Sequence, residues 1–130
     1  MIDPNVWVSA LINPDGAPAR GARAVAEGSV SAVVTEHLLD GLAGVLMRPR
    51  FRRWFSVADA SAFVEALRGY GDLRDAPGHS SRAVRDPDDD YLVALAEAAD
   101  AVLVTGDDDL LDADLTPPAI TPRELLERIA

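Results

Sequence analysis

The sequence predicts an α/β protein in which a parallel sheet lies between helices. Helical hydrophobic patterns alternate along the chain with short, mostly apolar segments that suit buried strands. The 130 residues fit one compact domain, because two independent cores would need a longer chain. The hydrophobic share of 48% is too high for a disordered chain. We therefore expect a single domain over residues 1–130.

The first half of the chain is predicted to begin with a very short strand at Ile2. Asp3 and Pro4 have the residue types of a helix cap and of the first helical position. Gly28 is expected to stop the second helix. The predicted elements are helices that begin at residue 4, at residue 18 (to 27) and at residue 35 (to 47), with a strand over 31–34.

The second half continues the alternation of helices and strands. Thr121 and Glu124 have the spacing of a capping box, with a proline at the first helical position between them. The predicted elements are a turn or short helix over 51–55, helices over 57–70 and 87–99, an irregular stretch with a short extended piece over 71–85, strands over 101–105 and 119–120, and a final helix from 122. The apolar faces expected to be buried are Leu38, Leu39, Leu42, Val45 and Leu46 in one helix, Phe63, Val64 and Leu67 in the next, and Leu92, Val93, Leu95 and Ala96 in the third.

The composition excludes several classes of protein. With no cysteine, the chain has neither disulfides nor thiolate metal ligands. No apolar run has the roughly 18–20 residues that a bilayer span needs, so we expect no membrane association. The start of the chain lacks the basic and apolar stretches of a secretory signal, and we expect a cytoplasmic protein. All 12 basic residues are arginine, which excludes mechanisms that need a catalytic lysine, such as those of phosphoryl-accepting aspartate domains.

The net charge of −10 comes from one block of sequence. Between Asp86 and Asp114 there are eleven acidic residues and no arginine, and the rest of the chain is close to neutral. An acidic protein repels nucleic acid, so a nucleic-acid substrate would need bound cations or local basic residues. The candidate basic residues are Arg48, Arg50, Arg52 and Arg53. A solvated cluster of arginines at the end of a helix explains them equally well without any ligand.

Acidic residues occur at three places where a strand meets a loop or a helix: Asp3, residues 86–90, and residues 107–109. The carboxyl ends of parallel strands meet at one crevice, where we expect Asp3 and Asp107 if their strands are neighbours. Asp90, in the first turn of its helix, is expected to point into the same crevice. Clustered carboxylates repel one another unless a cation is shared, and oxygen ligands suit Mg²⁺ or Mn²⁺.

Each acidic residue also has a simpler interpretation. Asp86, Asp88 and Asp3 have the positions of helix caps. Residues 105–107 have the composition of an ordinary turn. The charges expected to be solvated loop charges are those of Asp108, Asp112 and Asp114. Spacing alone leaves a metal site and these structural roles equally open. The two histidines, His37 and His79, have no partner at metal-ligand spacing, and we expect structural or surface roles for both.

Five motifs, in order along nearly the whole chain, resemble those of one known family. Residues 3–11 (DPNVWVSAL) are similar to its opening D-T-N-V-x-V-S-A-L, and residues 38–51 to its leucine-rich helix ending in R-P-x-F. Residues 86–96 match its D-P-x-D-D block, and residues 104–111 (VTGDDDLL) its V-T-G-D-x-D-L-L signature. Residues 120–126 match its closing T-P-x-E-x-L. On these motifs the chain resembles the PIN domain, in the toxin branch related to VapC-type endoribonucleases.

The resemblance implies a three-layer α/β/α sandwich with a central parallel sheet, and metal-dependent cleavage of RNA. It also implies Mg²⁺ or Mn²⁺ as cofactor, a cognate antitoxin protein that covers the site, and a homodimer, for which the aromatic residues Trp54 and Phe55 are candidates unless they cover the core. The residues implied at the site are Asp3, Asp90 and Asp107 as metal ligands and catalytic acids, Asp109 as an auxiliary metal ligand, and Asn5 and Thr105 in orienting roles.

The chain departs from the family pattern at three positions. The second acid of the family is a Glu, and that position is Gly41 here. Asp40 is adjacent but lies about 100° around the helix, so it would need a rotation or a bridging water to take the place of the Glu. Pro4 replaces a Thr, and only Met1 and Ile2 precede Asp3, where the family has a fuller first strand. These departures favour an alternative: a degenerate PIN-like domain with impaired or no nuclease activity that acts as a partner-binding module.

Overall fold

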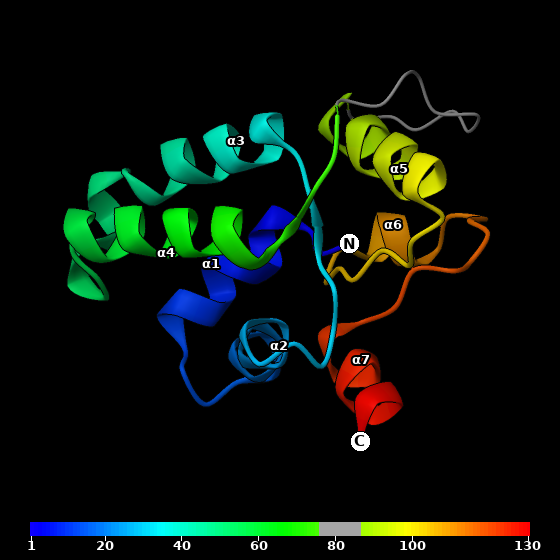
Figure 1. Cartoon of the computed structure of the whole chain (residues 1–130), viewed down its shortest axis with the longest axis horizontal. Helices are drawn as coiled ribbons and strands as arrows, with labels where there is room; N and C mark the ends of the chain where they lie inside the picture. Colours follow the sequence, from blue (N-terminus) through cyan, green and yellow to red (C-terminus); the bar gives the residue numbers. More distant parts are fainter. Residues whose placement is uncertain (76–86) are drawn as a thin grey trace.

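The computed structural model describes residues 1–75 and 87–130, a chain of helices linked by short parallel-paired segments (Figure 1). No helix in these two ranges is long and apolar enough to cross a membrane. The elements are α1 (Pro4–Ile12), α2 (Ala17–Ala26), β1 (Val33–Val34), α3 (Glu36–Leu46), the 3-10 helix η1 (Pro49–Arg53), α4 (Val57–Tyr70), β2 (Asp72–Leu73), α5 (Pro87–Ala99), α6 (Asp108–Leu111) and α7 (Pro122–Ile129).

The pairing between extended segments is parallel, but each paired segment is short. β1 and β2 pair over two residues each. Val104 forms single parallel bridges to Ile2 and to Ile120, which lie on opposite sides of it. The predicted strands over 31–34 and 101–105 are therefore shorter than expected. Two of the paired segments end where helix caps begin: Asp3 follows Ile2 and Thr35 follows Val34, and both residues cap helices, so the chain turns away from the sheet there.

Local capping signals place most helix boundaries. α4 and α5 have the predicted bounds, and α2 and α3 lie within one residue of them. The predicted capping box at Thr121 and Glu124 is confirmed, and Ser56 and Asp59 form a second one at the start of α4. The turn or short helix expected over 51–55 is a 3-10 helix, η1, which begins and ends two residues earlier. α6 falls in a stretch that was expected to be an acidic loop. Most of the irregular stretch, residues 76–85, lies outside the described residues.

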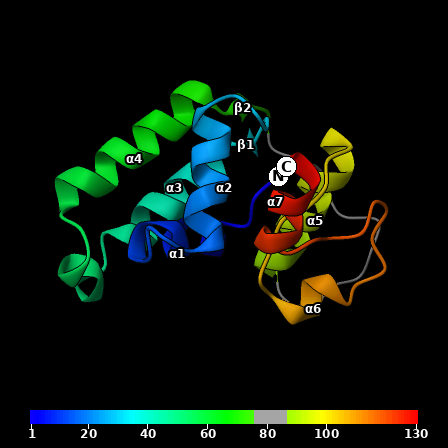
Figure 2. The ribbon, with the colours of Figure 1, turned by 90° about the horizontal axis from the view of Figure 1, so that it is seen from below.

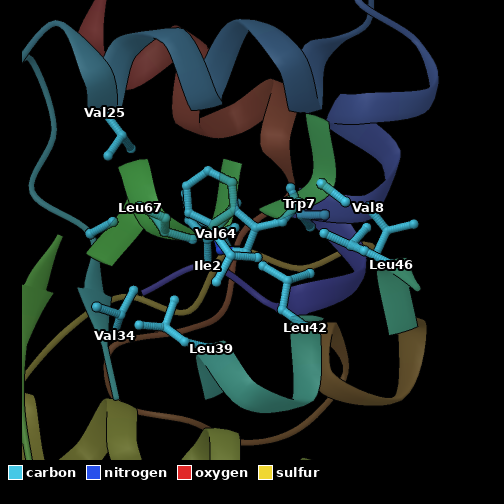
Figure 3. Close-up of a cluster of buried hydrophobic side chains, with 14 of the residues drawn as sticks. Ile2, Trp7, Val8, Val25, Val34, Leu39, Leu42, Leu46, Val64 and Leu67 are labelled. Carbon is cyan, nitrogen blue, oxygen red and sulfur yellow. The ribbon is translucent and has the colours of Figure 1, made fainter. Parts of the chain in front are cut away.

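The core has two parts. The first lies among α1, α3 and α4 (Figure 3), and the second lies beneath α5, on the opposite side of the molecule from η1 (Figures 1 and 2). The predicted face of α5 is buried in full. On α3, Leu38 and Val45 are only half-buried, because that side of the helix borders a pocket. Phe63 is also half-buried and packs edge-on against Trp7 at 5.8 Å between ring centres. The fully buried leucines of this core are Leu39, Leu42, Leu46 and Leu67 in the first part, and Leu95, Leu103 and Leu110 in the second.

Gly71 is expected to tolerate no side chain. A Cβ atom there would lie 2.7 Å from the carbonyl oxygen of Leu67 and 2.9 Å from a methyl carbon of Val34. We expect Gly71→Ala to lower the free energy of unfolding by about 1–3 kcal/mol, because backbone or core must shift. Gly69→Ala is the matched control, since its Cβ would meet nothing within 4 Å. The control should gain up to about 1 kcal/mol of helix propensity. Urea unfolding measures both, and equal stabilities would contradict the close approach.

Candidate active site

A pocket of about 360 Å³ opens where the first turn of α1, one side of α3, the start of α5 and the cap of α6 come together. Its acidic lining residues are Asp3, Asp89 and Asp107. Asp3 and Asp107 meet here because their segments are neighbours, joined by the parallel bridge between Ile2 and Val104. The other lining residues are Pro4, Asn5, His37, Leu38, Gly41, Leu42, Val45, Tyr91 and Leu92.

Asp3 is a helix cap and a pocket residue at the same time. Its side chain is only 4% exposed, and its Oδ1 accepts a hydrogen bond of 3.0 Å from the backbone N–H of Asn5. Its Oδ2 accepts one of 2.8 Å from the buried hydroxyl of Thr105. Asn5 is exposed at the rim of the pocket, so its amide is available to a ligand. The structural interpretation of Asp3 is therefore correct, and it is compatible with a role in the pocket.

Thr105 connects Asp3 to Asp107. The hydroxyl of Thr105 donates to Asp3 and accepts a hydrogen bond of 3.0 Å from the backbone N–H of Asp107. Asp107 caps α6, where its Oδ1 accepts a hydrogen bond of 2.9 Å from the backbone N–H of Asp109. The side chain of Asp109 is exposed and does not line the pocket. Asp109 thus supports Asp107 through its backbone, and Thr105 fixes the relative position of two pocket acids.

α5 contributes Asp89 to the pocket, whereas the sequence motif predicts Asp90. Asp90 is half-buried but is not among the lining residues. The two positions differ by about 100° around the helix, so a shift of one residue in register changes which carboxylate faces the pocket. Asp86 and the side chain of Asp88, for which caps were predicted, lie outside what the structure describes.

Gly41 lines the pocket on the α3 side. A Cβ atom built on it would meet nothing within 4 Å, so the space beside it is open. Asp40 is exposed and is not a lining residue, because it lies on a different side of α3. The structure therefore places Asp40 where it does not replace the acid that the family carries at the Gly41 position.

An aromatic pair borders the pocket and is not apparent from the sequence. The rings of His37 and Tyr91 lie 4.5 Å apart between centres. The hydroxyl groups of Tyr91 and Thr35 share a hydrogen bond of 2.8 Å. These contacts join α3 to α5 across 56 residues of sequence, so no local signal predicts them. They present aromatic surface beside the carboxylates.

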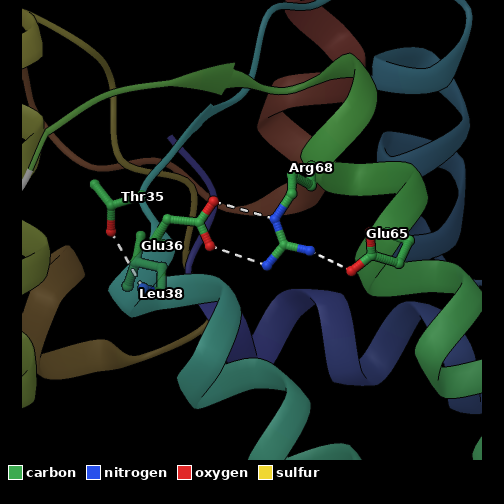
Figure 4. A network of polar contacts seen from close by, with 5 residues as sticks. All are labelled: Thr35, Glu36, Leu38, Glu65 and Arg68. Atoms are coloured by element: carbon green, nitrogen blue, oxygen red, sulfur yellow. Dashed lines mark hydrogen bonds and ion pairs between the residues drawn. The ribbon is translucent and has the colours of Figure 1, made fainter.

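The start of α3 is held by α4 as well as by its own cap (Figure 4). The Thr35 hydroxyl caps the helix by accepting a hydrogen bond from the backbone N–H of Leu38. The Arg68 guanidinium donates two hydrogen bonds, of 3.1 and 2.9 Å, to the Glu36 carboxylate and a third to Glu65. Arg68 lowers the pKa of Glu36, and the two carboxylates raise the pKa of Arg68. This exposed fork links the first turn of α3 to α4.

The donor set of the pocket fits a hard divalent cation by its chemistry. Among the described residues, Asp3 and Asp107 receive hydrogen bonds only from neutral donors, which leaves lone pairs on both carboxylates. Carboxylate oxygens are the ligands that Mg²⁺ and Mn²⁺ prefer, and a shared cation removes the repulsion between them. Within the described ranges, no three His, Asp or Glu side chains lie close enough to form a preassembled metal site. Asp3, Asp89 and Asp107 are the residues that would hold one.

The arginines of η1 do not line the pocket. Arg48, Arg50 and Arg53 are exposed, whereas Arg52 is half-buried and donates to the carbonyl oxygen of Leu46 at the end of α3. Three of the four have their guanidinium groups over neighbouring aromatic rings, at 4.8 to 5.4 Å from the ring centres. Trp54 is 45% exposed, while Phe55 is buried and covers the core.

Comparison with known proteins gives the class of this chain. Residues 1–109 match the PIN domain family, and the chain belongs to that family. PIN domains are α/β proteins and typically metal-dependent nucleases that bind RNA. The predicted family and the predicted α/β class are therefore confirmed.

One similar protein comes from Methanocaldococcus jannaschii and is described only as uncharacterized. It is 26% identical to this chain over 113 residues, which cover 85% of this chain and 72% of that protein. The similarity thus extends over most of this chain and is not confined to one motif.

Thr105→Val is expected to disturb both pocket acids without changing side-chain volume. It removes the donor to Asp3 and the acceptor for the Asp107 N–H, both at a fully buried position. We expect about 1–3 kcal/mol lower stability and about 10–100-fold weaker binding of Mn²⁺. Thr105→Ser keeps the hydroxyl and should stay near wild type in metal affinity. Calorimetric titration and urea unfolding measure the two effects, and a valine variant with unchanged metal affinity would contradict the linking role.

Proposed function

We propose that this chain is a metal-dependent endoribonuclease and the toxin component of a toxin–antitoxin system. The observation that carries the nuclease proposal is the meeting of Asp3, Asp89 and Asp107, from three distant parts of a PIN-family chain, at one pocket. The motifs shared with VapC-type endoribonucleases support the toxin role, a cognate antitoxin as partner, and a homodimer. The parallel bridges at Val104 support a three-layer α/β/α sandwich as the complete fold.

In this proposal Asp3, Asp89 and Asp107 hold Mg²⁺ or Mn²⁺, which when bound activates water and offsets charge on the phosphate that is cleaved. Thr105 keeps Asp3 and Asp107 in one fixed arrangement through its two hydrogen bonds. The Asn5 amide at the rim has donors for a phosphate oxygen. Burial of Asp3 limits its motion, so little reorganisation is needed when the ion and the RNA bind.

Asp107→Asn tests this proposal directly. Asn also caps helices, so α6 should remain while the charge of the carboxylate is lost. We expect RNA cleavage in Mg²⁺ or Mn²⁺ to fall by about 100-fold or more, and chelation of the metal to abolish cleavage by the wild type. Asp112→Asn is the control. Asp112 is an exposed acid at the other end of α6, and it does not line the pocket. Equal cleavage by wild type and Asp107→Asn would reject the proposed role.

Gly41 favours a second candidate, a degenerate PIN domain that binds a partner without cleaving RNA. The lining of the pocket has a glycine where the family has an acid, and exposed Asp40 does not fill that place. A calorimetric titration separates the two candidates. Heat of binding at micromolar to millimolar Mn²⁺ supports the nuclease, and its absence in the millimolar range supports the partner-binding module.

A further inference from the structure

The end of α3 and η1 form a basic, aromatic surface that the pocket does not use. We call Arg48, Arg50, Arg53 and Trp54 the arginine tip. All four side chains are exposed, and the Arg53 guanidinium lies 4.8 Å above the Trp54 ring centre. From residue 41 to residue 58 the chain carries four arginines and no acid. In a chain with a net charge of −10, this is a local reversal of sign that needs an explanation.

Arg52 shows what a structural arginine does in the same helix. It is half-buried, donates to the last turn of α3 and lies 5.4 Å from the Phe55 ring centre. Its role in ending α3 explains its presence. The side chains of the three tip arginines make no hydrogen bond or ion pair within the described residues. Their charges are therefore free to meet an outside anion.

α3 connects the pocket to the arginine tip. His37, Gly41 and Val45 recur every four residues on the side of α3 that lines the pocket. α3 ends at Leu46, and Arg48 follows two residues later as the residue that precedes η1. At 1.5 Å per residue, the end of α3 lies about 8 Å along the helix from Gly41. Figure 1 shows α3 running from beside α5 to the far end of the molecule, where η1 lies. A strand lying along α3 would reach both sites.

We propose that the arginine tip binds the single-stranded RNA that flanks the cleavage position. Arg48, Arg50 and Arg53 pair with phosphates, and Trp54 offers an exposed ring on which a base stacks. Exposed arginines combined with an aromatic platform are the usual means of holding a single strand without reading its sequence. The proposal rests on RNA as the substrate, and it explains how an acidic chain retains a polyanion: attraction is concentrated at one end of α3.

An RNA-binding assay tests this inference independently of cleavage. Fluorescence anisotropy measures the binding of a labelled single-stranded RNA of about 12 nucleotides in the presence of EDTA. We expect Trp54→Ala to weaken binding at least about fivefold, and Trp54→Phe to keep most of it, because a ring remains. Arg50→Gln/Arg53→Gln should weaken binding and lower the slope of log K against log salt by about 1.4, for two lost phosphate contacts. Thermal unfolding checks that each variant is folded.

The controls carry the same chemical changes elsewhere. Arg20→Gln/Arg123→Gln removes two exposed arginines from α2 and α7, and Tyr70→Ala removes an exposed ring at the other end of α4. Binding unchanged by the tip variants, or weakened equally by the controls, would overturn the inference. A tip variant that loses self-association in sedimentation but keeps its RNA affinity would instead make the tip a contact between copies. Because metal and cleavage are absent from the assay, failure of the nuclease proposal does not affect this result.

Discussion

Asp89→Asn is expected to reduce RNA cleavage by about 100-fold or more, while Asp90→Asn stays within a few-fold of wild type. Asp89 lines the pocket with Asp3 and Asp107, and Asp90 does not. Both substitutions remove one negative charge at neighbouring positions of the same helix, so general effects of charge on RNA binding should be equal. The pair is therefore its own matched control.

The measurement is the initial rate of cleavage of one RNA at saturating Mn²⁺, with the thermal midpoint of each variant recorded beside it. Each variant should unfold near the wild-type temperature, since half-buried acids at the start of a helix contribute modestly to stability. The opposite ranking, with Asp90→Asn inactive and Asp89→Asn active, would mean that α5 presents a different residue to the metal, and it would return the assignment to the one suggested by the sequence.

Gly41→Glu is expected to increase nuclease activity and metal affinity by about tenfold or more, because it adds a carboxylate to a pocket that would hold a divalent ion. The space beside Gly41 is open, since a Cβ there meets nothing within 4 Å. Replacing glycine inside α3 also adds up to about 1 kcal/mol of stability through helix propensity. The Cβ of the added residue therefore meets no neighbouring atom, and the substitution does not weaken the helix.

Gly44→Glu is the matched control for this gain. Gly44 is also in α3, and its Cβ would also meet nothing within 4 Å, but it does not line the pocket. The control receives the same charge and the same gain in helix propensity. If activity is unchanged in Gly41→Glu, or rises equally in both variants, Gly41 is not a vacant ligand position, and the degenerate candidate gains support only if metal binding is also absent.

The elements that depend on local signals were predictable from the sequence. The boundaries of α4 follow from hydrophobic spacing and a capping box, and those of α5 from hydrophobic spacing, signals that act within a few residues. The lengths of the strands were not predictable in this way, because pairing at Val104 depends on segments about 100 and 16 residues away. α6 was missed since its consecutive aspartates have the composition of a solvated loop, while Asp107 caps a short helix whose Leu110 is buried.

Part of the candidate site was also predictable from the sequence. Asp3 and Asp107 follow from their places at the ends of neighbouring parallel segments, a rule of topology. The choice between Asp89 and Asp90 depends on the rotation of α5, which spacing does not fix. The contact between His37 and Tyr91 joins two helices far apart in sequence and requires the folded chain.

The proposed nuclease requires Asp3, Asp89 and Asp107 to share one divalent ion. Anomalous diffraction from crystals soaked in Mn²⁺ locates such an ion by its own scattering. We expect one strong peak in the pocket, with carboxylate oxygens of these three residues about 2.0–2.3 Å from it and the remaining ligands supplied by water. A peak bound elsewhere, or a pocket without a peak in crystals soaked at millimolar Mn²⁺, would contradict it.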